Sequence, residues 1–108
     1  MASYNDLKYD FTATLVGQGR KFNDKGSGQT IKLTLDSKAN NAGGRSDEFV
    51  VQLQAQAQQM WFTVKTAAFP RNGKKTVEFK DMAATAYRLR FEKSTDNVRV
   101  TGTGVMSN

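Results

Sequence analysis

The chain has 108 residues, enough for one hydrophobic core, and we expect residues 1–108 to form a single domain. It contains no cysteine and no histidine, which excludes disulfide bonds, thiol chemistry, histidine-ligated zinc and imidazole acid–base catalysis. Sixteen lysine and arginine residues against ten aspartate and glutamate residues give a net charge of +6, which suits a polyanionic partner but is also ordinary for a small soluble domain.

The first half of the chain contains three segments in which apolar and polar residues alternate. Such alternation is typical of strands with one buried face, so we expect strands over 7–15, 31–35 and 48–55. The stretches between these strands are rich in glycine and polar residues, and they predict turns and loops. The polar ends, residues 1–6 and 106–108, are expected to be flexible.

The segment 56–68 fits two interpretations. Read with a period of two, Met60 and Phe62 point to one side and Trp61 and Lys65 to the other, as in a strand that exposes the only tryptophan. The same segment also fits the apolar spacing of a helix, and its alanine and glutamine residues favour that conformation. Strand and one short helix therefore both stay open for this segment.

The second half of the chain continues with a turn and further alternating segments. Asn72-Gly73 is a strong signal for a type I′ hairpin. Alternation predicts strands over 76–80 and 87–91 and a last strand that begins at Val98. With six or seven short strands and at most the one short helix, we expect an all-β domain, either a small barrel or a sandwich.

The sequence contains no recognisable catalytic or metal-binding motif. Acid–base catalysis needs two carboxylates in contrasting environments, and the one adjacent pair in this chain, Asp47-Glu48, would point to opposite faces of a strand. The segment GQGRKF lacks the ending of a phosphate-binding loop. We therefore expect a protein that is not an enzyme and that uses no metal, no cofactor and no small-molecule substrate.

What remains is a pattern of cations and aromatic rings at outward-facing positions of the expected strands and in the links between them. An exposed ring beside cations suits a nucleobase and its phosphate. A charged outer face is equally typical of any soluble sheet, and Trp61 is equally compatible with a place in the core. The residues that we predict to bind nucleic acid on this basis are Arg20, Lys21, Phe22, Lys32, Trp61, Lys65, Phe69, Arg71, Lys74, Lys75, Arg88 and Arg90.

The order of the segments also matches a known pattern. A first strand that ends in TATLVGQG is followed by IKLTLDSK, by the polar loop KANNAGGRSDE and by FVVQLQAQA. Over about residues 12–80 this order resembles the OB-fold domain of bacterial and phage single-stranded-DNA-binding proteins. The resemblance implies an OB-like barrel and places Phe49 where that family has an aromatic residue that stacks on DNA. The second stacking position falls near Leu53 or Ala55, and the family's acidic C-terminal tail is missing.

We therefore expect non-catalytic binding of single-stranded nucleic acid, with DNA favoured over RNA and with little sequence specificity. A domain of this size contacts few nucleotides, so we also expect a homo-oligomer, whose copies bind together. The alternative is a structural, assembly or protein-interaction subunit of a phage-type or bacterial complex. Its contact surface would be glutamine-rich, formed by Gln52, Gln54, Gln56, Gln58 and Gln59.

The sequence also predicts where the protein is found. A membrane-spanning helix needs about 18 consecutive apolar residues, and the chain has no such run, so we expect no membrane partner. The first residues, MASYNDLK, lack the charged and apolar regions of a signal peptide. We therefore expect a cytoplasmic protein, or one in the host cytoplasm if a phage encodes it.

Overall fold

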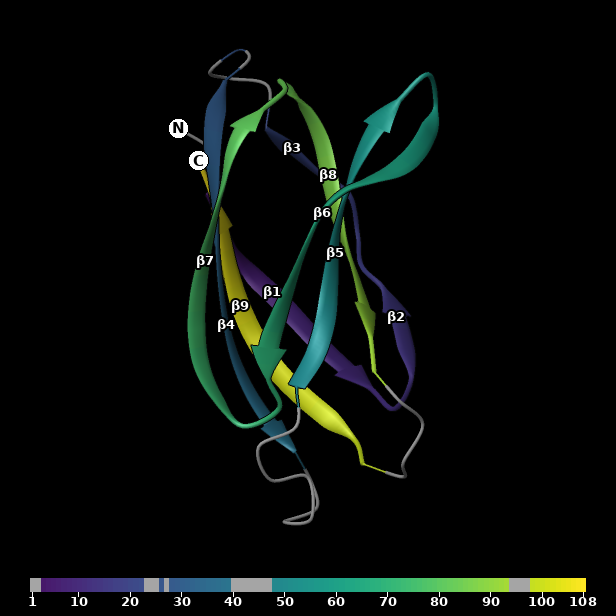
Figure 1. The fold of residues 1–108 in the computed structure, drawn as a ribbon, viewed down its shortest axis with the longest axis vertical. Coiled ribbons are helices and arrows are strands. Elements are labelled where there is room, and N and C mark those ends of the chain that lie inside the picture. The colour runs from purple at the N-terminus through teal and green to yellow at the C-terminus, as the bar shows by residue number, and fades with distance from the viewer. Residues whose placement is uncertain (1–2, 23–25, 27, 40–47, 94–97) are drawn as a thin grey trace.

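A computed structural model of the chain describes residues 3–22, 26, 28–39, 48–93 and 98–108, and these residues form nine strands and no helix (Figure 1). Within these ranges there is accordingly no helix that could span a membrane. The prediction of an all-β fold is confirmed. The strands are β1 (Ser3–Phe11), β2 (Thr14–Val16), β3 (Arg20–Phe22), β4 (Gln29–Ala39), β5 (Glu48–Ala57), β6 (Met60–Pro70), β7 (Gly73–Met82), β8 (Thr85–Glu92) and β9 (Val100–Ser107).

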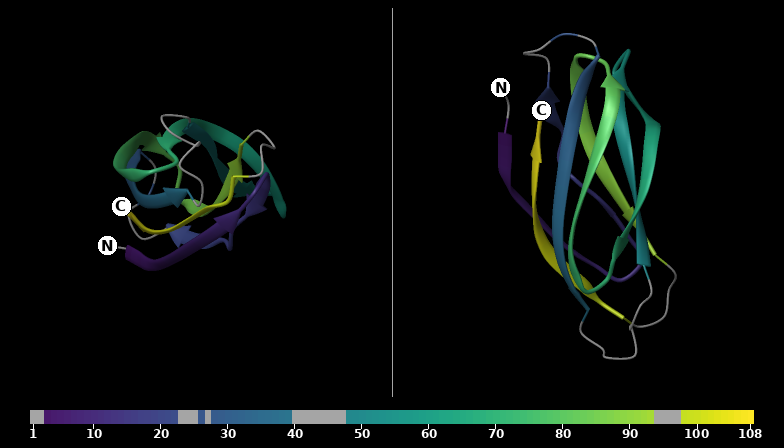
Figure 2. Two further views of the ribbon diagram at one scale, coloured as in Figure 1. Left: turned by 90° about the horizontal axis from the view of Figure 1, so that it is seen from below. Right: turned by 60° about the vertical axis from the view of Figure 1, so that its left-hand side comes forward.

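The strands form two antiparallel sheets that face each other (Figures 1 and 2). Of the two predicted architectures, barrel and sandwich, the structure is therefore the sandwich. The four-stranded sheet has the order β1-β9-β4-β7. The five-stranded sheet has the order β2-β8-β5-β6, and β3 also pairs with β8 beside β2. The sandwich is elongated, with extents of 43 × 24 × 20 Å. The outer surface of each sheet is therefore a long face on which alternate residues of neighbouring strands meet.

The first alternating segment is divided between the two sheets. β1 ends at Phe11 and pairs with β9, whereas β2 begins at Thr14 and pairs with β8. The alternation continues through this crossover because the inner faces of both sheets line the same core. Tyr9 and Phe11 are buried on one sheet, and Leu15 packs against the core from the other. A single predicted strand over 7–15 is therefore two strands.

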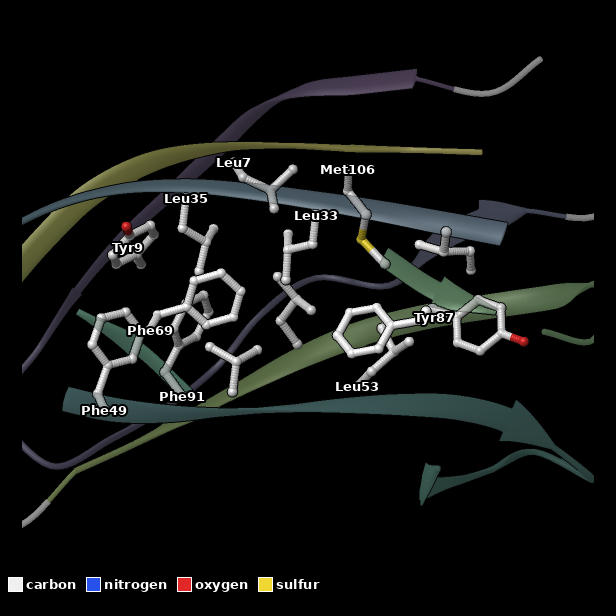
Figure 3. Packing of buried hydrophobic residues seen from close by; sticks show 14 of the residues in the cluster. Leu7, Tyr9, Leu33, Leu35, Phe49, Leu53, Phe69, Tyr87, Phe91 and Met106 are labelled. Carbon is white, nitrogen blue, oxygen red and sulfur yellow. The ribbon is translucent and has the colours of Figure 1, made fainter. Parts of the chain in front are cut away.

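Aromatic rings from both sheets fill one end of the core (Figure 3). Tyr9 of β1 stacks on Phe91 of β8 with ring centroids 4.8 Å apart. Phe49 of β5 meets Phe11 edge-on at 5.3 Å and stacks with Phe69 of β6 at 6.1 Å. Rings of this size bury much apolar area, which is the main source of stability in a domain of 108 residues.

The segment 56–68 is extended, so the strand interpretation is confirmed and the helical one is wrong. β5 and β6 are joined by a tight turn at Gln58 and Gln59, whose φ angles of 52° and 65° are those of a type I′ turn. Between the pairs Leu53–Lys65 and Gln54–Thr63 the register shifts by one residue, so that β6 contains a bulge at residue 64. A regular strand pattern and helical spacing overlap over so short a segment, and the pairing with β5 decides between them.

The turn at Asn72-Gly73 is present but does not form a hairpin. β6 pairs with β5 in one sheet, and β7 pairs with β4 in the other. Gly73 has a φ of 119°, a conformation that residues other than glycine rarely adopt. Asn72 does not have the positive φ that a type I′ turn also requires, so the chain turns here as expected but the prediction of a type I′ hairpin is wrong.

Candidate nucleic-acid interface

The outer face of the five-stranded sheet gathers the polar side chains of β5 and β8. On β5, Gln52 and Gln54 alternate with core residues, and on β8 so do Arg88 and Arg90. The antiparallel register sets Gln52 opposite Arg90 and Gln54 opposite Arg88. A period of two therefore places two amides and two guanidinium groups side by side on one surface.

Trp61 of β6 lies across this surface. It is opposite Gln56 in the register, and its ring reaches Arg88, whose Cζ lies 4.7 Å from the ring centroid. The far edge of the indole contacts the link between β2 and β3, where a Cβ atom added to Gly19 would lie 2.9 Å from Cη2. The ring is half-buried by these neighbours. Trp61 is thus held in a fixed position on an outer face, and the interpretation that places it in the core is wrong.

Hydrogen bonds connect the same surface into a ladder. Arg88 Nε donates to Gln54 Oε1 at 2.7 Å, and Gln54 Nε2 donates to Thr63 Oγ1 at 3.2 Å. Arg90 Nη1 and Thr63 Oγ1 donate to Gln52 Oε1 at 3.3 and 3.4 Å. Each guanidinium group is therefore oriented by a glutamine amide. We call the residues of this ladder together with the tryptophan the Trp–Arg surface, which comprises Gln52, Gln54, Trp61, Thr63, Arg88 and Arg90.

The two arginines of the Trp–Arg surface differ in their electrostatic surroundings. Arg90 forms an ion pair with Glu92, and both side chains are 36% exposed. Among the described residues Arg88 makes no ion pair; its guanidinium group contacts the indole and Gln54. Positive charge is therefore least compensated at Arg88, beside the aromatic ring, and this is where an anionic group would gain most.

The other aromatic residues of the predicted site are buried in the core. Phe22, Phe49 and Phe69 are 0, 1 and 0% exposed, so they cannot stack on a base, and these three predictions are wrong. The physical reason is the same for all: each occupies an inward position of its strand, where a ring fills the space between the sheets. Arg71 is likewise buried, at 2% exposed, and is not available to a phosphate.

Several predicted cations lie away from the Trp–Arg surface. Arg20 points toward β1, where its Nη1 donates to Asp6 Oδ1 at 2.6 Å. Lys75 donates to the Ala68 carbonyl at 2.8 Å. Lys32 and Lys74 belong to the four-stranded sheet, where they stand opposite Glu78 and Asp36. The structure thus separates Arg20, Lys32, Lys74 and Lys75 from the tryptophan, because they lie on the other sheet or at the edges of the sandwich.

Two further lysines lie near the Trp–Arg surface. Lys21 of β3 is exposed and stands opposite Ala86, which precedes Arg88 by two residues and so shares its outer face. Lys65 is exposed at the edge of the sheet, but it stands opposite the buried Leu53 and so lies on the other face of β6. Of the predicted binding residues, the structure brings together Lys21, Trp61, Arg88 and Arg90.

Sequence reasoning missed the residues that position this set. Gln52 and Gln54 were placed on an outer face, but only the register shows that each holds an arginine. Gly19 was assigned only to a glycine-rich link between strands, whereas its missing side chain makes room for the indole. Two glycines so close together, Gly17 and Gly19, are a signal that something approaches the backbone there, although the sequence does not reveal what.

No protein-family model and no curated protein sequence matches the chain. Among solved structures, the crystal structure of the Yersinia pseudotuberculosis-derived mitogen (YPM) is similar, with a TM-score of 0.53 and 10% identity over 99% of this chain and 85% of that one. The CBM36-1 domain of a multidomain xylanase from the hindgut metagenome of Trinervitermes trinervoides has a TM-score of 0.46 and 16% identity, over 95% of this chain and 71% of that one. The likeness to the mitogen shows a common β-sandwich fold, and the resemblance to single-stranded-DNA-binding proteins stays a prediction.

Proposed function

We propose that the Trp–Arg surface binds single-stranded nucleic acid, DNA in preference to RNA, without catalysis. The observation that carries this proposal is the contact between Trp61 and Arg88 on an outer face, with 4.7 Å between Arg88 Cζ and the ring centroid. An indole and a guanidinium plane are both surfaces on which a base stacks, and a guanidinium group also binds phosphate. One aromatic–cation pair on the sheet therefore offers contacts to both parts of a nucleotide.

The surroundings of this pair support a binding mode that is insensitive to base sequence. Stacking of one base on an aromatic side chain contributes about 1–3 kcal/mol, and every base has a face that can stack. The carbonyl oxygens of Gln52 and Gln54 already accept hydrogen bonds from Arg90 and Arg88, and the amide nitrogen of Gln54 donates to Thr63, so these atoms are occupied rather than aimed at base edges. Lys21 and the net charge of +6 add a phosphate attraction that salt weakens.

A titration with labelled oligothymidylate at about 50 and about 200 mM salt tests the proposal. We expect binding that weakens with salt and that changes the fluorescence of Trp61, because a stacked base alters the surroundings of the indole. The variant Arg88→Gln should weaken binding by about tenfold, a loss typical of a charge-assisted contact. Trp61→Ala should weaken it to a similar degree and remove the fluorescence signal.

The matched control is Lys32→Gln, which removes the same charge from the exposed face of the four-stranded sheet. We expect its affinity to stay within about twofold of the parent, because an exposed charge on the far sheet is largely screened. The absence of binding at the lower salt concentration would refute the proposal. Equal losses in Arg88→Gln and Lys32→Gln would show that net charge alone attracts the oligonucleotide and would remove the Trp–Arg surface from the site.

A further inference from the structure

β6 is an edge strand, and half of it carries an exposed apolar strip. It pairs with β5 on one side, and the sheet order ends there. Met60, Phe62 and Val64 are 58, 48 and 44% exposed. They lie where the β5–β6 hairpin leaves the body of the sandwich, at the upper right of Figure 1. A strand edge with free backbone groups and an apolar strip invites another strand.

The two halves of this edge are not equally open. Toward the end of β6, Lys75 Nζ donates to the Ala68 carbonyl at 2.8 Å, and Pro70 has no backbone N–H to offer. The bulge at residue 64 interrupts the strand in its middle, and bulges of this kind limit edge pairing. The accessible part of the edge is therefore residues 60–64, the same part that carries the apolar strip.

We propose that a second copy of the chain pairs with this part of β6, antiparallel, about a two-fold axis through Phe62. In that register Phe62 lies opposite Phe62 of the partner subunit, and Met60 lies opposite Val64 of the partner subunit. Opposite residues of an antiparallel pair share a face, so the apolar strips of both copies meet. The period-two spacing of these residues makes the strip complementary to itself, as a two-fold interface requires.

The charges near the edge agree with this register. Lys65 lies beyond the bulge and outside residues 60–64, so the two lysines are not brought face to face. A register displaced by one residue would set Trp61 among the apolar side chains and turn Phe62 away from them, because a shift of one exchanges the two faces of a strand. The apolar spacing and the limits of the accessible edge, residues 60–64, thus both select the axis at Phe62.

Such a dimer would join the two Trp–Arg surfaces, and this consequence rests on the proposed function. Trp61 would lie opposite Thr63 of the partner subunit, and both are on the outer face of the five-stranded sheet. The joined sheets would present two indole–guanidinium pairs on one continuous surface. A single strand that contacts both pairs would bind far more tightly than either pair binds alone, because the second contact becomes intramolecular.

Cross-linking through a single introduced cysteine tests the register without any nucleic acid. The chain contains no cysteine, so Phe62→Cys gives one thiol per copy. Directly opposite residues of an antiparallel pair have the Cα separation that a disulfide requires. We expect Phe62→Cys to form a disulfide-linked dimer under mild oxidation, whereas Val105→Cys does not, although Val105 is 39% exposed on the four-stranded sheet. An equimolar mixture of Met60→Cys and Val64→Cys should yield mixed dimers well beyond the roughly twofold excess over each homodimer that random pairing gives.

Sedimentation equilibrium of the unmodified chain and of Phe62→Lys gives the second measurement. We expect a monomer–dimer equilibrium whose dissociation constant rises at least about tenfold in Phe62→Lys, since two ammonium groups would then face each other. Val105→Lys, which adds the same charge elsewhere, should leave the constant within about twofold. Equal cross-linking of Phe62→Cys and Val105→Cys, or a chain that stays monomeric at all concentrations, would overturn the dimer.

The same measurements separate this inference from the proposed function. A dimer that forms without oligonucleotide binding leaves the inference standing and refutes only the nucleic-acid proposal. A chain that stays monomeric but binds oligonucleotide refutes the dimer and leaves the nucleic-acid proposal standing. Binding of the monomer to vesicles of anionic phospholipid, lost in Phe62→Lys and kept in Val105→Lys, would assign the apolar strip to a lipid surface and also overturn the dimer.

Discussion

The indole of Trp61 lies against the backbone of Gly19, so closely that a Cβ atom on residue 19 would come within 2.9 Å of Cη2 and 3.1 Å of Cζ2. These two residues are far apart in the sequence, and the indole of Trp61 reaches Gly19 across the outer face of the five-stranded sheet. Gly19 does not have a positive φ, so its role is to leave space rather than to adopt a special conformation. The orientation of the indole therefore depends on residue 19 having no side chain.

This contact predicts that Gly19→Val displaces the ring. The β-branched side chain cannot share the space with the indole, so Trp61 should turn toward solvent and leave Arg88. We expect its emission to shift to longer wavelength and oligonucleotide binding to weaken by about fivefold, as expected when part of a stacking contact is lost. The free energy of unfolding should change by less than about 1 kcal/mol, because the site is on the surface.

The control for this variant is Gln18→Val, which introduces the same side chain at the exposed neighbouring position. Its emission and affinity should equal those of the parent. If Gly19→Val also left both quantities unchanged, the ring would not depend on this contact and the Trp–Arg surface would not be held in place by it.

A second prediction concerns the turn at Gln58-Gln59. Both residues have positive φ angles, 52° and 65°, and a left-handed conformation costs a residue with a side chain about 1–2 kcal/mol. Asparagine and glycine adopt this conformation more readily and are the preferred pair in type I′ turns. Replacing Gln58-Gln59 by Asn-Gly should therefore raise the free energy of unfolding by about 1 kcal/mol, measured by urea denaturation. The reversed pair, Gly-Asn, is a control for composition and should gain less.

The comparison of these two turns shows how far sequence reasoning reaches in this chain. Asn72-Gly73 carries a strong local signal, and a turn is present there, but the strands on either side belong to different sheets. Gln58-Gln59 carries no such signal, yet it closes the true hairpin between β5 and β6. Local propensity marks where the chain bends, whereas the partner of each strand is decided by burial over the whole domain.

The candidate site was predictable to a similar extent. Alternation correctly placed Arg88 and Arg90 outward, and it correctly placed Trp61 on the outer face of its strand. The ring is half-buried there, whereas Met60 and Phe62 on the other side of the strand are exposed, because the hairpin leaves the body of the sandwich. Phe22 was misjudged because a short strand in a glycine-rich link gives too few residues to establish which face is buried. The pairing of each arginine with a glutamine follows from strand order and register, which a single sequence does not specify.

A third prediction concerns stability at alkaline pH. Burial raises the pKa of Tyr9 above its ordinary value of 10.0; the hydrogen bond with Ser37 lowers it, and the charge of Asp36 raises it further. Burial likewise raises the pKa of Tyr87, opposed by the hydrogen bond to the Ala83 carbonyl. In the unfolded chain both phenols lose their protons at lower pH than in the folded protein. The folded state is therefore fully stabilised below about pH 10 and loses stability as the pH rises beyond it.

Urea denaturation at several pH values between about 8 and 11 measures this effect. We expect the free energy of unfolding to be level at first and then to fall. In Tyr9→Phe the decline should be about half as steep, since Tyr87 alone then contributes. The variant itself should be less stable at every pH by about 1–3 kcal/mol, because the buried hydroxyl of Ser37 loses its partner. An identical slope in parent and variant would contradict the burial of the Tyr9 phenol.

The last prediction concerns the place where Tyr9 meets β9. Gly102 stands opposite Tyr9 on one side and Ser37 on the other, and a Cβ atom there would overlap Tyr9 Oη and the Asp36 carbonyl oxygen. The carbonyl belongs to the backbone of β4 and cannot move away without disturbing the pairing of β4 with β9. We therefore expect Gly102→Ala to lower the free energy of unfolding by about 3 kcal/mol, the upper end of what overpacking usually costs.

The neighbouring Thr103→Ala is the control, because Thr103 is exposed on the outer face and its loss should change stability by no more than about 0.5 kcal/mol. A double-mutant cycle then separates the part of the Gly102→Ala penalty that is due to the phenolic oxygen of Tyr9 from the rest. In the Tyr9→Phe background the phenolic oxygen is gone, so Gly102→Ala should cost less than in the parent, and the difference measures the overlap with Oη. The remainder should persist, because the Asp36 carbonyl oxygen and the ring carbon Cζ of residue 9, which a Cβ atom at residue 102 would also overlap, are still in place. A Gly102→Ala chain as stable as the parent would mean that β9 can shift away from β4, and the close packing of Tyr9, Gly102 and Asp36 would then not be a fixed feature of this sandwich.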